Sequence, residues 1–222
     1  MANASEKEEY LAQLSRSYLY KDILDLSGIR YGNKLRDLLR LLAYQTGSLV
    51  SFSELGRSLG LTTDTVQRYV DLLEQSFVVF RLTGFSRNLR KEIVKNPKVY
   101  FYDLGIRNAV LENFNPPDKR QDRGGLWENF LLLERIKAQS YRQQRPNRFF
   151  WRTYTGAEID YVEESGGNLR GYAFKGQARR AKAPATWSDT YPQAVFASVH
   201  RENYLDFILA EDNRSSAPSS LP

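Results

Sequence analysis

Two short helical patterns followed by two strand patterns, within residues 51–103, limit the folds open to this chain more than any other segment. A helix over Ser53–Leu59 opens with a serine, Gly60 supplies a turn, and a second helix runs from Thr62 or Thr63 to about Gln75. The strand patterns FVVFRL (77–82) and KVYFYD (98–103) follow. This order predicts a helix-turn-helix closed by a hairpin, which is a winged helix.

The rest of the chain divides around a segment rich in turn-forming residues. Helical patterns over 6–26 and 34–44 predict a helical lead-in across 1–46, ahead of a winged helix at 47–112. The sequence NFNPPDKRQDRGG at 113–125 is typical of a linker. We expect a second domain over 126–210 and a disordered, low-complexity tail over 211–222.

The expected second domain opens with a helix and continues with strands. The patterns predict a helix over about 126–140, a three-strand meander over 148–175, a helix over 184–189 and a strand over 194–200. The fold class predicted for the whole chain is therefore mixed α/β.

Composition excludes several classes of protein. The 222 residues include no Cys and one His, so disulfides, zinc ribbons and cysteine nucleophiles are ruled out, and any metal would bind oxygen ligands. No apolar run approaches the roughly 20 residues that a membrane span requires. We expect a cytoplasmic protein without a membrane partner.

Positive charge gathers in the expected wing. Residues 81–98 carry +5 of the formal net charge of +6. A basic wing beside the second helix is the arrangement in which helix residues reach base edges and wing cations neutralise phosphates. The alternative is a protein-docking module with a solvated hairpin. The DNA interpretation assigns contacts to Thr63, Thr65, Arg68, Arg87, Arg90 and Lys91.

Three charged residues of the second domain suggest metal chemistry. Glu128 lies on the predicted helix, Asp160 on the middle strand and Lys175 at the end of the next strand. Hydrolysis of a phosphodiester uses carboxylates that converge on Mg²⁺ and a lysine that orients water or neutralises charge. Such trios are common in α/β domains, so a purely structural role stays open.

Five blocks, in order, resemble one large family. They are YLYKDIL (18–24), the segment at 51–82, KVYFYDLGIRNAVL (98–111), GGLWENFLLLE (124–134), and the pair GAEIDYV and GYAFK. The chain resembles the C-terminal region of prokaryotic AAA-type ATP-binding proteins, in which a P-loop ATPase domain precedes a winged helix and a nuclease-like domain. The resemblance implies a PD-(D/E)-x-K nuclease fold whose site falls on Glu128, Asp160 and Lys175.

One position departs from that motif. The resemblance places an acid two residues before the lysine, and this chain has Ala173, which cannot bind a metal. Glu158 or Gln177 could substitute. We therefore expect a degenerate nuclease site and no cofactor, with Mg²⁺ or Mn²⁺ needed only if the chain is a weak nuclease.

The sequence contains no GxxxxGK(S/T) motif, so we expect no ATP hydrolysis by this chain. The leading interpretation is a module that binds DNA or a partner, such as an ATPase domain, and is either an excised C-terminal piece or a stand-alone remnant. An interaction module without nucleic-acid binding is the third possibility, and the oligomeric state is left open.

Overall fold

The computed structural model describes residues 6, 9–11, 13, 32–87, 96–178 and 181–210. The predicted tail at 211–222 lies outside the described residues, as does most of the predicted helix over 6–26. Among the proposed DNA contacts, Arg90 and Lys91 also lie outside them.

Helices α3 (Gly32–Tyr44), α4 (Phe52–Leu59) and α5 (Thr63–Gln75) pack around one apolar core. Local caps define their ends. The Ser51 side chain accepts the Glu54 amide at the start of α4, Gly60 ends that helix in a left-handed conformation with φ of 65°, and Thr62 caps α5 through the Thr65 amide. The two predicted helices and the turn between them are confirmed.

Six strands in the described part of the chain form one mixed sheet. They are β1 (Val79–Gly84), β2 (Lys98–Phe101), β3 (Asn147–Arg152), β4 (Glu158–Ser165), β5 (Asn168–Phe174) and β6 (Val195–Val199), in the order β2-β1-β3-β4-β5-β6. Strands β3, β4 and β5 form the predicted antiparallel meander, and β6 joins β5 in parallel. The predicted mixed α/β class is confirmed.

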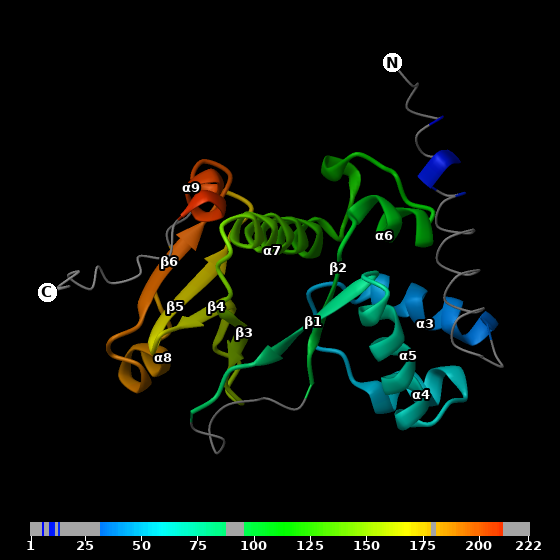
Figure 1. Ribbon diagram of the computed structural model, residues 1–222, viewed down its shortest axis with the longest axis horizontal. Helices are drawn as coiled ribbons and strands as arrows, with labels where there is room; N and C mark the ends of the chain where they lie inside the picture. Colours follow the sequence, from blue (N-terminus) through cyan, green and yellow to red (C-terminus); the bar gives the residue numbers. More distant parts are fainter. Residues whose placement is uncertain are drawn as a thin grey trace, which may run out of the picture.

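Strand β1 joins the two halves of the chain. It pairs with β2 in antiparallel fashion, and its end pairs in parallel with β3 through Thr83–Phe149 and Gly84–Phe150. Figure 1 shows β1 running from the helical end of the molecule to the sheet. The expected wing is thus not a free hairpin. The winged-helix assignment and the domain division at 113–125 stay predictions, and strands from both sides of that division share one sheet.

Helices cover both faces of the sheet. Helices α7 (Arg123–Tyr141) and α9 (Tyr204–Leu209) share one core with the sheet, whereas α8 (Ala185–Thr190) contributes Trp187 to another. Helix α6 (Leu104–Val110) and the turn η2 (Pro117–Lys119) connect β2 to α7. Helix α7 begins at Arg123, earlier than the predicted Leu126, and neither α6 nor α9 was predicted.

A buried ion pair holds the short helix α9. Arg135 on α7 is fully buried, and its Nε lies 2.9 Å from Glu163 Oε1 on β4. Its Nη1 also donates to the carbonyl oxygen of Phe207, at 3.1 Å. This network positions α9 across α7 and the sheet. No described helix is long and apolar enough to cross a membrane.

Candidate functional site

A buried ammonium lies between two carboxylates where the helical and sheet parts of the chain meet. Lys98 Nζ, from the first residue of β2, lies 3.0 Å from Glu128 Oε1 on α7 and 2.6 Å from Glu158 Oε1 on β4. The Lys98 side chain is only 3% exposed. Each pair links segments at least 30 residues apart, so the cluster forms only in the folded chain.

Two aromatic side chains complete this cluster. The Tyr100 hydroxyl donates to Glu128 Oε1 at 2.5 Å, and the Lys98 ammonium lies 5.6 Å from the centre of the Phe150 ring. Burial and the neighbouring Glu128 carboxylate raise the pKa of Tyr100 well above its ordinary value. Tyr100 therefore stays a hydrogen-bond donor at neutral pH.

The charges of the cluster are coupled. Burial disfavours a charge on Lys98, but the Glu128 and Glu158 carboxylates outweigh it and raise the pKa of the ammonium. Burial also raises the pKa of Glu128, and Lys98 offsets only part of that rise. Lys98 is thus firmly protonated, and it is the group that makes a buried Glu128 carboxylate tolerable.

Close backbone packing brings α7 to this point. A Cβ at Gly125 would lie 2.5 Å from the Thr46 carbonyl oxygen, so only glycine fits there. One turn later, Asn129 accepts the Phe101 amide and donates to the Phe101 carbonyl, both at 2.8 Å. These contacts hold the start of α7 against Thr46 before Glu128 and against β2 after it.

The remaining predicted nuclease residues lie close by. Asp160 Oδ2 accepts the Phe174 amide at 2.7 Å, beyond the last ladder pair of β4 and β5, Tyr161–Tyr172. Burial raises the pKa of Asp160, while the bond from Phe174 and the ammoniums of Lys98 and Lys175 lower it in part. The structure therefore brings Glu128, Asp160 and Lys175 into one region, where their charges act on one another.

The side chains in this region do not fit a divalent cation. The Lys98 ammonium already binds Glu128 and Glu158, and Glu158 also pairs with Arg152 at 3.3 Å. Ala173 is buried and offers no ligand atom. Within the described ranges, no group of three or more His, Asp or Glu side chains is arranged to hold a metal ion. Glu158 serves the ammonium, and the alternative Gln177 is exposed.

Lys98, Tyr100 and Asn129 were missed by the sequence analysis. Lys98 had been counted among the basic residues of the wing, and its burial corrects that count. A weak signal existed, because Lys98 starts a strand whose other residues are Val, Tyr and Phe, and all four are buried.

The predicted DNA-binding residues of α5 show different exposure. Thr63 and Arg68 are exposed, whereas Thr65 is half-buried and its hydroxyl lies 2.8 Å from that of the cap residue Thr62. Two half-exposed acids of this helix pair with Arg81, whose Nη2 lies 2.8 Å from Asp71 Oδ1 and whose Nε donates to Glu74 Oε2 at 2.8 Å. Arg81 is therefore engaged and does not act as a free wing cation.

Arg87 is the described residue of the wing whose charge faces solvent. It is exposed, its guanidinium lies 5.8 Å from the centre of the Phe85 ring, and its amide donates to the Tyr191 hydroxyl at 3.2 Å. The start of the connection between β1 and β2 is thus held against Tyr191, the residue that follows α8.

Two family models match the chain. Residues 1–117 match a family described as "Domain of unknown function (DUF8612)" and residues 123–198 match "Domain of unknown function (DUF4143)". Uncharacterized proteins Mb2031c of Mycobacterium bovis and Rv2008c of Mycobacterium tuberculosis are each 33% identical over 174 residues, which is 76% of this chain and 37% of theirs.

A further uncharacterized protein, from Haemophilus influenzae, is 26% identical over 142 residues, which is 62% of this chain and 34% of that protein. The chain thus spans little more than a third of the length of the curated relatives it matches. No solved structure matches it significantly.

Proposed function

The chain belongs to the family defined by the domain of unknown function DUF8612, and we propose that it serves there as a non-catalytic module that binds duplex DNA. The observation that carries this proposal is the exposed polar face of α5, which holds Thr63, Gln67 and Arg68 in a helix-turn-helix setting. Such a face can present an amide and a guanidinium to base edges.

Charge pairing within the module favours this function. Asp71 and Glu74 are 39% and 30% exposed and would repel phosphates, and their shared ion pair with Arg81 reduces that repulsion. Asp64 is then the exposed acid that remains on α5 beside Arg68. Arg87 provides an exposed cation for phosphate contact, although it lies in the segment fastened near α8.

The buried cluster supports the non-catalytic part of the proposal. Metal-assisted cleavage of a phosphodiester needs carboxylates that are free to bind a divalent cation. In this chain Glu128 and Glu158 already bind the Lys98 ammonium, at 3.0 Å and 2.6 Å, so neither carboxylate is free to bind a cation. The nuclease-like part would then act as a scaffold that is fastened to the DNA-binding helices.

An ATPase domain is the partner that the family resemblance suggests. The relatives extend far beyond the matched part, which leaves room for such a domain in those proteins. Within this proposal, the chain supplies the DNA contact and a separate ATPase domain supplies the motor.

Fluorescence anisotropy of a labelled duplex, titrated at low and moderate salt without metal, tests the DNA-binding proposal. We expect the affinity for the duplex to fall as the salt concentration rises, and to be lower in Arg68→Ala than in the wild type. If Arg68 contacts a DNA phosphate, the slope of log affinity against log salt should be smaller by about one in that variant. Arg145→Ala, an exposed arginine before β3, is the matched control and should bind as the wild type does. Absence of binding at low salt would contradict the proposal and favour a protein-docking module.

A further inference from the structure

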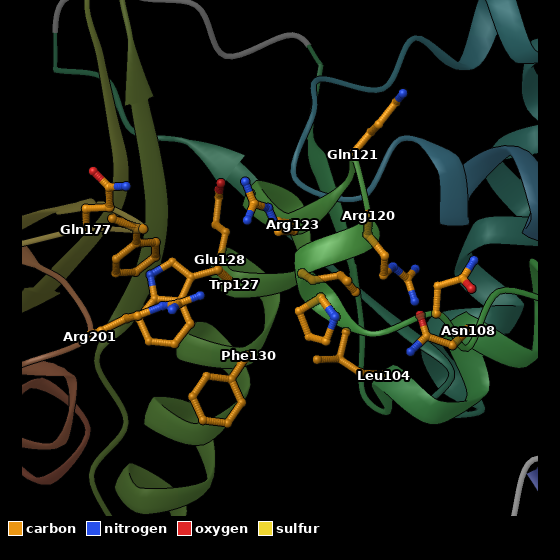
Figure 2. A pocket seen from close by; sticks show the side chains of 16 residues that line it. Leu104, Asn108, Arg120, Gln121, Arg123, Trp127, Glu128, Phe130, Gln177 and Arg201 are labelled. Carbon is orange, nitrogen blue, oxygen red and sulfur yellow. The ribbon is translucent and has the colours of Figure 1, made fainter. Parts of the chain in front are cut away.

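A cleft of about 840 Å³ opens beside the Lys98 cluster, within the size range of small-molecule sites. It lies between the connection that contains η2, the first turns of α7, and the residues that follow β5 and β6 (Figure 2). Glu128 reaches its wall from α7. The cleft is thus separate from the exposed face of α5.

Two unpaired guanidinium groups give this cleft a net positive charge. Arg123 and Arg201 line it, both are exposed, and neither makes an ion pair or hydrogen bond among the described side chains. The other charged lining residues are satisfied, since Arg120 pairs with Asp122 at 2.8 Å and Glu128 pairs with Lys98. Arginine forks suit phosphate groups because they can donate two parallel hydrogen bonds.

The start of α7 adds to this positive character. Asp122, at the N-cap position, makes no capping hydrogen bond, because its carboxylate binds Arg107 at 2.5 Å and Arg120. No acid occupies the first turn of α7, so its first amides stay available to an anion. This feature strengthens the attraction that the two arginines already provide.

The remaining wall suits a flat organic group. Trp127 and Phe130 line the cleft as a stacked pair with ring centres 5.7 Å apart. The Trp127 indole is fixed by a 3.1 Å hydrogen bond from Nε1 to the Lys175 carbonyl. The side-chain amide of Gln177, which lies on the Trp127 side of the cleft in Figure 2, can pair with the edge of a base.

We propose that this cleft binds a free mononucleotide, with its phosphates at Arg123 and Arg201 and its base toward Trp127 and the Gln177 amide. This ligand combines a dianionic group with a flat ring that carries hydrogen-bonding edges, which is the combination the cleft offers. The proposal goes beyond DNA binding by α5 and does not depend on it.

Binding of the fluorescent nucleotide mant-ADP to the full chain tests this site, because Trp127 is a natural energy donor in the cleft. The other tryptophans, Trp151 and Trp187, are each 1% exposed and lie in a separate core. We expect saturable energy transfer that is clearly reduced in Trp127→Phe, and a dissociation constant at least tenfold higher in the double variant Arg123→Ala/Arg201→Ala. Arg145→Ala, which removes an exposed arginine outside the cleft, should bind as the wild type does.

Competition identifies the ligand. Displacement of mant-ADP by ADP at lower concentrations than by pyrophosphate or a single-stranded 12-mer would support a free mononucleotide. The proposal is overturned if the double arginine variant binds as well as the wild type, or if pyrophosphate or the 12-mer competes as well as ADP. Arg68→Ala should weaken duplex binding without changing mant-ADP binding, so failure of either proposal can be told from failure of the other.

Discussion

The ammonium of Lys98 lies 3.0 Å from the carboxylate of Glu128, and this contact joins the helical part of the chain to the sheet part. The lysine starts β2 and the glutamate lies on α7, so neither element can move away without exposing an unpaired buried charge. Glu158 on β4 adds a third element to the same contact.

Replacement of Lys98 by methionine should therefore destabilise the protein strongly. Removal of one partner of a buried ion pair costs about 3–5 kcal/mol, because the remaining charge has no compensation. We expect urea denaturation of Lys98→Met to give a free energy of unfolding lower by about 3 kcal/mol. Lys137→Met is the control, since Lys137 pairs with Glu134 on the surface and its loss should cost under about 1 kcal/mol. Equal stability of both variants would contradict the role of Lys98.

The two glycines at the start of α7 should respond in opposite ways to alanine. A Cβ at Gly125 would lie 2.5 Å from the Thr46 carbonyl oxygen, whereas a Cβ at Gly124 would meet no atom within 4 Å. We expect Gly125→Ala to lower the melting temperature and destabilise by about 1–3 kcal/mol. Gly124→Ala should be neutral or stabilise by up to about 1 kcal/mol, because alanine favours helix. A melting temperature of Gly125→Ala at or above that of Gly124→Ala would refute this close approach.

Local signals made the helices predictable and the buried charges unpredictable. Helix α5 was predicted to end near Gln75, where it does end, because its threonine cap and apolar spacing are encoded within the segment. Lys98 and Arg81 were both counted as wing cations. Their partner carboxylates lie on other elements, and nothing in the local sequence indicates that pairing.

The start of α7 shows a second limit of sequence reasoning. Gly124 and Gly125 were interpreted as the end of a linker, since glycine pairs usually mark loops. In the structure both lie within the helix, and Gly125 allows the close contact with Thr46. Likewise α9 is only six residues long, and its carbonyls are held by Arg135 from far away in the chain. Tertiary contacts therefore decide both features.

Asp122 should make the stability of the protein sensitive to acid. Hydrogen bonds from Arg120 and Arg107 hold the pKa of Asp122 well below its ordinary value of 3.8, so ionised Asp122 favours the folded state. That contribution is present above about pH 3.8 and is lost as the pH falls further toward the lowered pKa. Glu128 and Asp160 have raised pKa values and act in the opposite direction, because their protonation on acidification favours the fold.

Comparison with Asp122→Asn isolates this effect. Asparagine cannot ionise, so the difference in unfolding free energy between wild type and variant should be constant at neutral pH and shrink below about pH 3.8. Chemical denaturation at a series of pH values measures it. A difference that stays constant down to pH 2.5 would show that Asp122 keeps an ordinary environment.

Restoring the missing acid should not create a nuclease. In Ala173→Asp the new carboxylate would join Asp160, but Lys98 would still hold Glu128 and Glu158. We expect no cleavage of labelled DNA in Mg²⁺ or Mn²⁺ by this variant. Metal-dependent cleavage that requires the new aspartate would show that the ammonium does not block the site.

The most direct test of the central claim is gel electrophoresis of supercoiled plasmid incubated with the wild-type protein and Mn²⁺, beside Asp160→Ala. A module that binds DNA without catalysis predicts a retarded plasmid band in the native gel with both proteins. After removal of the protein, the plasmid should still be fully supercoiled. Nicking by the wild type that disappears in Asp160→Ala would contradict the account and establish the chain as a metal-dependent nuclease.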